Sequence, residues 1–289
     1  MSINESNYQD HIPLDKSWII RMGVLDIISD KKDTINFLSK QPSLSDDLHS
    51  LLTASMEWIR GDKKIHVGES GTLYRFLKFL SWKKELHKEF VKKGTLTDRK
   101  ITDNPKIVRF HLEELLNLDH QTSQWASAAV LLGNEEYISN PPYKLQLTYE
   151  AVKHWNLQRA QGKTWIPRYD ETILRQARSF LELLNTGTIE FTPLQAEDYC
   201  FARIFGLMTP EEAEKRWASL QGHESNRIKS MEITIEQIRK EEVVDSKDHR
   251  IVQAAAMYCK YKNANPKIQY PEVVEKSWPQ FWYFLNNIS

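Results

Sequence analysis

Apolar and polar residues alternate along the chain in two recurring patterns, and polar side chains gather where the helical pattern begins. Apolar residues spaced i, i+3, i+4, i+7 predict amphipathic helices. Helices are expected near 17–28, 45–58, 71–80, 110–118, 123–132, 145–155, 173–184, 195–208, 228–238 and 251–258. Short apolar runs at 34–38, 64–67 and 188–192 predict strands. The sequence therefore predicts an α/β architecture with many polar helix starts.

Some of these helix starts have a purely structural explanation. Ser17 is a good N-cap residue for the first helix. Thr209 and Glu212 form a capping box around Pro210, so the acidic residues there are predicted to be structural.

The stretch 68–80 is open to two interpretations. Gly68 and Gly71 allow the backbone N–H groups at the helix start to approach a ligand closely, and such groups attract anions. This favours a carboxylate or phosphate pocket, to which Arg75 would add a charge. The other interpretation is an ordinary helix start, in which Arg75 is solvated or supports the loop without touching a ligand. Glu69 fits an anion pocket poorly, because a carboxylate repels an anionic ligand.

The length of 289 residues suggests about two domains. The segment 158–167 contains Gly162 and Pro167 and is predicted to be a linker. We expect a first domain at 15–157 and a second at 158–289. Residues 1–14 are expected to be an extended lead-in that can pack on the second domain.

Charge and composition exclude several classes of partner. The 39 basic residues balance 39 acidic ones, so nucleic acid and membrane surfaces are not expected as partners, and an anion site must be built locally. No apolar run approaches the ~20 residues of a membrane span. Cys200 and Cys259 lack metal-site spacing and are expected to be reduced core residues of a cytoplasmic protein.

Seven short motifs occur in a fixed order along the chain. They are Lys16-Ser17 with Arg21, Gly71-Thr72 with Arg75, Ser123-Gln124, Pro142-Tyr143, Glu224 with Arg227, Asp248-His249-Arg250, and Lys276-Ser277-Trp278-Pro279. Together they span Lys16 to Phe281, and in this order they resemble the motifs of the EPSP synthase (3-phosphoshikimate 1-carboxyvinyltransferase) family.

The resemblance implies a fold and an activity. The fold would be a two-domain inside-out α/β barrel of βαβαββ units, here with a trimmed second domain and as a monomer. The activity would be transfer of the enolpyruvyl group of phosphoenolpyruvate to the 5-hydroxyl of shikimate 3-phosphate, with release of phosphate, in aromatic amino-acid biosynthesis. Neither a metal nor an organic cofactor is implied.

Roles of individual residues follow from the resemblance alone. Lys16 would touch both substrates, and Glu224 matches the proton-transfer glutamate of the family. Binding of shikimate 3-phosphate is implied for Ser17, Arg21, Thr122, Ser123, Gln124 and Tyr143. Binding of phosphoenolpyruvate at the cleft edge is implied for Gly71, Thr72, Arg227, His249, Arg250 and Lys276. Asp198 corresponds to the catalytic aspartate of the second domain, with Glu197 as the other candidate.

The chain also departs from the family pattern. It is shorter, by about one βαβαββ unit after Tyr143. His223 stands in place of a lysine, either as a proton shuttle or as a solvated residue. Asn226 replaces an aspartate, and Asn104 stands where an arginine is expected, with Arg99 nearby. Two alternatives to the transferase therefore stay open: a non-catalytic relative that binds a phosphorylated anion, and a transferase with another acceptor.

Overall fold

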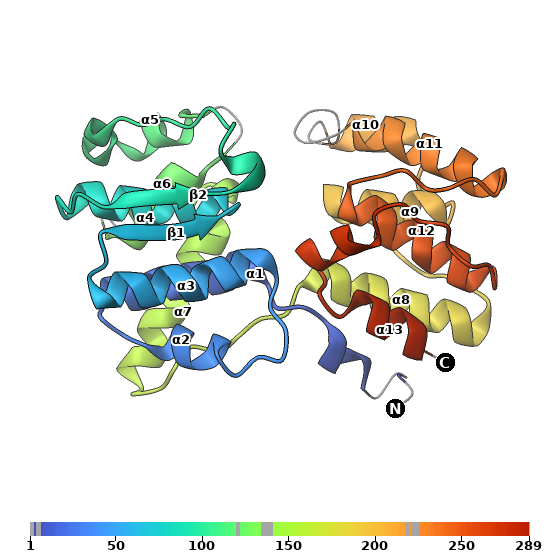
Figure 1. Cartoon of the computed structure of the whole chain (residues 1–289), viewed down its shortest axis with the longest axis horizontal. Coiled ribbons are helices and arrows are strands. Elements are labelled where there is room, and N and C mark those ends of the chain that lie inside the picture. The colour runs from blue at the N-terminus through green and yellow to red at the C-terminus, as the bar shows by residue number, and fades with distance from the viewer. Residues whose placement is uncertain are drawn as a thin grey trace. The chain divides into compact units, whose positions relative to one another are not determined.

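The computed structural model describes residue 3 and residues 7–119, 122–133, 141–217, 220 and 226–288. The chain divides into two compact units, which are described separately. The N-terminal unit is Leu14–Arg168, and the C-terminal unit combines Met1–Pro13 with Tyr169–Ser289 (Figure 1).

The N-terminal unit contains most of the helices expected from the sequence. They are α1 (Lys16–Ile28), α2 (Asp33–Leu38), α3 (Asp46–Arg60), α4 (Gly71–Lys83), α5 (Leu112–Leu116), α6 (Gln124–Leu131) and α7 (Gln146–Ala160). Its strands are β1 (Lys64–Gly68) and β2 (Glu89–Lys92). Short 3₁₀ helices are η2 (Gly94–Leu96), η3 (Pro105–Arg109) and η4 (Tyr143–Leu145).

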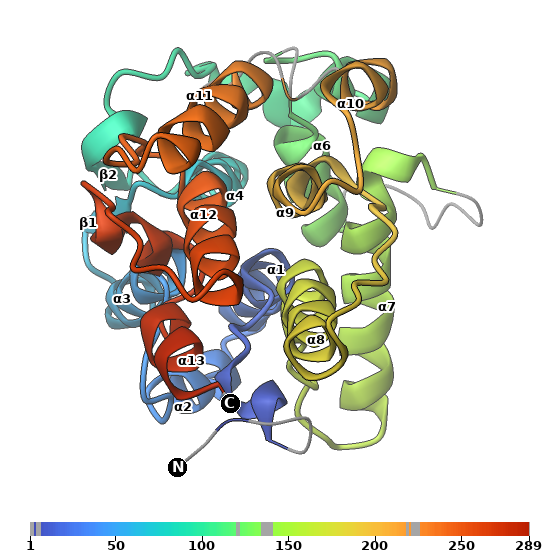
Figure 2. The same cartoon turned by 90° about the vertical axis from the view of Figure 1, so that its right-hand side faces the viewer.

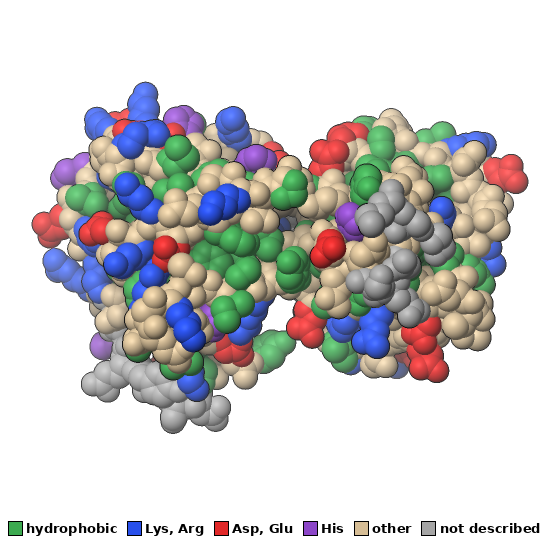
Figure 3. Space-filling view, turned by 90° about the horizontal axis from the view of Figure 1, so that it is seen from below, with side chains coloured by type: hydrophobic (Ala, Val, Ile, Leu, Met, Phe, Trp, Pro, Cys, Tyr) green, Lys and Arg blue, Asp and Glu red, His purple; other side chains and the backbone are tan. Residues whose placement is uncertain are grey.

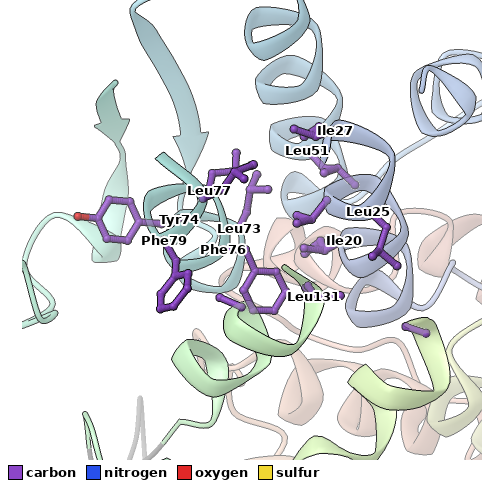
Figure 4. Packing of buried hydrophobic residues seen from close by; sticks show 14 of the residues in the cluster. Ile20, Leu25, Ile27, Leu51, Leu73, Tyr74, Phe76, Leu77, Phe79 and Leu131 are labelled. Atoms are coloured by element: carbon purple, nitrogen blue, oxygen red, sulfur yellow. The ribbon is translucent and has the colours of Figure 1, made fainter. Parts of the chain in front are cut away.

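The core of this unit forms where α1, α3 and α4 meet. Leu73, Phe76 and Leu77 lie on one face of α4, and Figure 4 shows this face beside Ile20 of α1 and Leu51 of α3. All five side chains are almost fully buried. Complete burial of a side chain of this kind contributes about 1.5–3 kcal/mol. The apolar stripe that predicted α4 is therefore the stripe that holds it in the unit.

The two strands form a small parallel sheet. Lys64 pairs with Glu89 and Ile65 with Phe90, and α4 provides the crossover between the strands. Burial alternates along β1: Ile65 and Val67 are buried, whereas Lys64 and His66 are exposed. β1 packs against α3, and the Glu57 carboxylate of α3 accepts from the His66 backbone N–H at 2.7 Å.

In the C-terminal unit, the regular secondary structure of the described residues is helical, apart from isolated bridges. Its helices are α8 (Glu171–Thr186), α9 (Tyr199–Ile204), α10 (Pro210–Arg216), α11 (Arg227–Arg239), α12 (His249–Tyr261) and α13 (Phe281–Asn287). Short 3₁₀ helices are η1 (Tyr8–His11), η5 (Ala196–Asp198) and η7 (Pro271–Lys276). Figures 1 and 2 both show α12 between α11 and α13. Nine residues of α12 are buried, which makes it the central helix of this unit.

The start of the chain contacts the C-terminal unit. Ile3 forms a parallel bridge with Ile288, and the Trp278 Nε1–H donates to the His11 carbonyl at 2.7 Å. Tyr8 and Ile12 are buried in the same hydrophobic cluster as Phe281. The lead-in is thereby part of this core.

The predicted fold class is wrong. The structure is 61% helical, and its described residues contain two parallel strands and no closed barrel, in place of an inside-out barrel of βαβαββ units. The physical reason is a lack of strand-forming segments: 34–38 forms helix α2, and 188–192 forms no strand. In α2, the Thr34 N–H and hydroxyl both donate to the Asp26 carboxylate, which fixes a helical start.

The cap of the first helix also differs from the prediction. Asp15, not Ser17, is the N-cap of α1, and its Oδ1 accepts from the Trp18 N–H at 3.0 Å. The capping box at Thr209 and Glu212 is confirmed. Basic and acidic side chains are interspersed on the face drawn in Figure 3, in keeping with the balanced composition.

Candidate anion-binding site

Two arginines and an aspartate meet where α12 begins. Asp248 is the N-cap of α12, and its Oδ1 accepts from the Arg250 backbone N–H at 2.9 Å. Its Oδ2 accepts from Nε of Arg227, the first residue of α11, at 2.7 Å. Burial alone would raise the pKa of Asp248, but the charge and hydrogen bond of Arg227 outweigh burial and lower it. Both ions are therefore held in their charged forms.

The Arg250 side chain has donors that lack an acceptor. The residue is 8% exposed, and its Nη2 lies 3.7 Å from Asp170 Oδ2, which is an ion-pair distance longer than a hydrogen bond. Nε and Nη1 have no hydrogen-bond partner within the described part of the chain. A buried donor left unsatisfied costs about 1–3 kcal/mol, and more when it is charged. The described residues therefore supply no acceptor for these two donors.

Gln253 and Cys200 add neutral groups to this region. One turn further along α12, Gln253 Nε2 donates to Ser277 Oγ at 3.0 Å, which holds the segment after Lys276 against the helix. Burial raises the pKa of the Cys200 thiol to about 12, and Asp248 adds to the effect, while Arg227 and Arg250 oppose it. Cys200 therefore stays a neutral thiol near the guanidinium groups.

A second cluster forms between the starts of α4 and α6 in the N-terminal unit. Gln124 joins the two helices: its Nε2 donates to Thr72 Oγ1 at 2.6 Å, and its Oε1 accepts from Arg75 Nη1 at 2.7 Å. Arg75 also donates from Nε to Asp119 Oδ2 at 3.4 Å. Burial lowers the pKa of Arg75, and Asp119 counters the effect. The cluster thus joins two of the predicted motifs through side-chain bonds.

Gly71 has close side-chain neighbours in the structure, and its close approach to a ligand stays a prediction. A Cβ at this position would lie 3.1 Å from Arg75 Nη1 and 3.4 Å from Arg99 Nη1. The backbone is therefore approached by two guanidinium groups. Arg75 supports this turn through Gly71, Gln124 and Asp119, in line with the second interpretation of the stretch. Glu69 accepts from the Thr95 hydroxyl and faces Gly94.

Arg21 is held inside the N-terminal unit. It is 7% exposed, its Nε donates to Thr148 Oγ1 at 2.9 Å, and its Nη1 donates to the Ser17 carbonyl at 2.7 Å. Its guanidinium lies 5.5 Å from the centre of the Phe76 ring. Burial lowers the pKa of Arg21 to about 10. Through these contacts, Arg21 of α1 packs against α4 and α7.

The remaining predicted residues of the N-terminal unit are dispersed. Lys16 Nζ pairs with Asp47 Oδ2 at 2.8 Å. Ser123 Oγ donates to the Lys144 carbonyl, and Thr122 Oγ1 accepts from the Gln124 N–H. Tyr143 is 88% exposed.

The C-terminal unit holds the other predicted residues. Asp198 is fully buried and accepts from Arg175, Gln176 and the backbone N–H of Leu194. These bonds hold the turn before α9. His249 and Lys276 are half-buried, at the start of α12 and the end of η7. Glu224 and His223 lie outside the described residues.

Two residues of the α12 cluster were not predicted as site residues. Asp170 is the N-cap of α8, where its Oδ1 accepts from the Ile173 N–H. Nothing in the sequence indicated its proximity to Arg250. Gln253 follows Arg250 by three residues, so the helical spacing alone places both on one face. This spacing was the signal that could have added Gln253 to the motif.

Within the described ranges, histidine, cysteine and acidic side chains form no group that could hold a metal ion. None of the described helices has the length and apolar character needed to cross a membrane. Comparison of the chain with protein-family models, with curated proteins and with solved structures finds no match.

Proposed function

We propose that this chain binds a small phosphorylated or carboxylated anion at the start of α12. The observation that carries the proposal is the buried Arg250 guanidinium, whose Nε and Nη1 lack acceptors within the described residues. Arginine recognises phosphate and carboxylate oxygens through charge-assisted hydrogen bonds. An anion seated here would satisfy both donors.

The surrounding charges are compatible with this ligand. Asp248 is engaged by Arg227 at 2.7 Å, so its negative charge is compensated. Asp170 lies 3.7 Å from Arg250 and is the carboxylate with which an anion would compete. The favourable dipole at the start of α12 adds to the attraction. A small anion that approaches Arg250 from the side of Nε and Nη1 is therefore favoured.

A titration with and without Arg250 tests this function. Isothermal calorimetry with inorganic phosphate, phosphoenolpyruvate and shikimate 3-phosphate is expected to show binding to the wild-type chain. Arg250→Met is expected to weaken it at least about tenfold, because about 1.4 kcal/mol of charge-assisted bonding is lost. Arg178→Met removes the same charge from an exposed position of α8 and should bind like the wild type. Equal binding by all three proteins would overturn the proposal.

A second candidate is enolpyruvyl transfer from phosphoenolpyruvate to shikimate 3-phosphate in a cytoplasmic, cofactor-free monomer. The specific support is the ordered set of seven motifs, five of which stand at or near the starts of α1, α4, α6, α11 and α12. Glu224 would transfer the proton, with His223 beside it. Release of inorganic phosphate from a mixture of both substrates tests this activity. Binding without phosphate release would favour the non-catalytic relative.

The altered-acceptor alternative has its own test. Phosphorylated cyclitols and sugars, each incubated with phosphoenolpyruvate, should release phosphate if the acceptor differs from shikimate 3-phosphate. Turnover with shikimate 3-phosphate alone would exclude this alternative.

A further inference from the structure

A pocket of about 440 Å³ lies at the other end of α12 from Arg250. The C-terminal parts of α9, α11 and α12 surround it, and the turn after each helix completes its wall. A helix of 13 residues is about 20 Å long, so the pocket and the proposed anion site are separate. The volume lies in the range typical of small-molecule sites.

The body of the pocket is apolar. Ile204, Ile235, Ile238, Tyr258 and Cys259 line it. Ile204 and Cys259 are buried, and the other three are half-buried. Gly206, in the turn after α9, has a φ of +74°, and a Cβ there would meet nothing within 4 Å. This lining fits an apolar ligand body such as an aromatic ring.

The charged groups of the pocket differ in how firmly they are held. Arg203 forms two bonds with the Glu232 carboxylate, at 2.6 and 2.8 Å, and is therefore part of the wall. Arg239 lies 3.9 Å from Glu236, and its side chain is 72% exposed. Glu236 makes the shorter contact with Lys240, at 3.2 Å, so Arg239 is only weakly paired.

Lys262 is a second positively charged lining residue, and it lies near Tyr258 of the wall and the neighbouring Tyr261. Its Nζ lies 5.7 Å from the centre of the Tyr258 ring and 4.8 Å from that of Tyr261. Glu241 is the acidic lining residue, and the Lys267 ammonium donates to its backbone carbonyl at 2.9 Å. With Arg203 paired to Glu232, the charges of Arg239 and Lys262 exceed that of Glu241 at the rim.

We propose that this pocket binds an apolar monocarboxylic acid with an aromatic ring. The ring would lie against Ile235, Ile238 and Tyr258, and the carboxylate would be attracted by Arg239 and Lys262. The proposal is independent of the anion site at Arg250, because it depends on different residues at the opposite end of α12.

Isoleucine methyl NMR with 3-phenylpropionate as the probe tests this pocket directly. The δ1 methyl groups of Ile204, Ile235 and Ile238 are expected to shift in a saturable manner as the probe is added. The uncharged 3-phenylpropionamide should bind at least about fivefold more weakly, since it lacks attraction to the two cations. Equal affinity for the acid and the amide, or no shift of these methyl groups at millimolar probe, would overturn the proposal.

Matched variants locate the carboxylate. Arg239→Gln and Lys262→Gln should each weaken binding of 3-phenylpropionate about twofold to fivefold, as expected for partly exposed charges. Lys229→Gln, at an exposed position of α11, should leave it unchanged. Ile235→Trp, which fills the pocket, should abolish binding. A separate titration of the wild type with phosphate tests the Arg250 site. If phosphate does not bind, the methyl shifts caused by 3-phenylpropionate should still be observed, because the pocket involves other residues.

Discussion

Arg227 Nε lies 2.7 Å from Asp248 Oδ2 and joins the first residue of α11 to the N-cap of α12. The Asp248 side chain is 8% exposed, so this ion pair is shielded from solvent. Removal of one partner from a buried pair is far more harmful than loss of an exposed pair, because the other charge is left uncompensated. The pair therefore determines how the helix starts around Arg250 are held together.

The first prediction concerns Asp248→Asn. Asparagine keeps the N-cap acceptor but removes the negative charge that faces Arg227. We expect the free energy of unfolding of the C-terminal unit at pH 7 to fall by about 2–3 kcal/mol. Urea denaturation measures this loss. Glu236→Gln, which breaks only exposed pairs on α11, should cost less than about 0.5 kcal/mol.

The same pair predicts a dependence on pH. The pKa of Asp248 is lowered from its ordinary value of 3.8 in the folded chain, so the folded state binds its proton more weakly than the unfolded state does. The stability due to Asp248 is complete above the ordinary value and is lost as the pH falls through the lower, folded-state pKa. The difference between the wild type and Asp248→Asn should shrink below pH 4. A difference that stays constant from pH 7 to pH 3 would contradict this explanation.

For Arg250 we predict a gain in the free energy of unfolding, in contrast to the loss expected for Asp248→Asn. Arg250→Met should raise the free energy of unfolding of the ligand-free chain by about 1 kcal/mol, because a buried guanidinium with unsatisfied donors is replaced by an apolar side chain. Phosphate should then stabilise the wild type and leave Arg250→Met unchanged, because a ligand stabilises the state that binds it. Urea unfolding with and without phosphate measures both effects. Destabilisation of the variant by more than 1 kcal/mol would assign Arg250 a structural role.

Local patterns in the sequence predicted the helices better than the fold. The helical spacing of Leu73, Phe76 and Leu77 predicted α4 correctly. These side chains share one face of the helix, and all three are buried. The capping box at Thr209 was equally local. The run 34–38 shows the limit of this reasoning, since its apolar residues suit a strand but Asp26, eight residues earlier, fixes a helical start.

The candidate site shows the same division between local and long-range information. The order Asp248-His249-Arg250 placed an arginine at a helix start, and the structure has it there. The sequence could not show that Arg250 would lie 3.7 Å from Asp170, 80 residues away, or that Arg75 would bond to Gln124. These contacts depend on tertiary packing. Packing therefore determines whether the guanidinium of an arginine in a sequence motif has hydrogen-bond acceptors within the chain.

Asp26 is a buried acceptor of the N-terminal unit, and it yields the fourth prediction. Its carboxylate is almost fully buried and accepts from Thr34, Trp155, Trp165 and Arg159. Asp26→Asn should lower the free energy of unfolding by about 3–5 kcal/mol, because an amide group would face donors in place of a carboxylate oxygen. Urea denaturation and near-ultraviolet circular dichroism of the tryptophans measure the effect.

An exposed aspartate serves as the control for this variant. Asp62 pairs with Arg60, and its side chain is 38% exposed. Asp62→Asn should change the free energy of unfolding by less than about 1 kcal/mol. If Asp26→Asn were as stable as Asp62→Asn, the buried network around Asp26 would not have the structural role given to it here.

Gly23 lies where α1 packs tightly against α2 and α3, and the last prediction follows from it. A Cβ at Gly23 would lie 2.8 Å from Leu51 Cδ1 of α3 and 3.2 Å from Thr34 Cγ2 of α2. Alanine is the better helix former by about 1 kcal/mol, but overpacking of a core costs about 1–3 kcal/mol. Because Leu51 is fully buried and has little room to move, we expect Gly23→Ala to destabilise the unit by about 1–2 kcal/mol. In a Leu51→Ala background the contacts with Leu51 are absent and only the longer one with Thr34 remains, so Gly23→Ala should there become less destabilising or neutral. A double-mutant cycle by urea denaturation measures this coupling, and additive effects of the two substitutions would show that Gly23 is not required for the packing of α1 on α3.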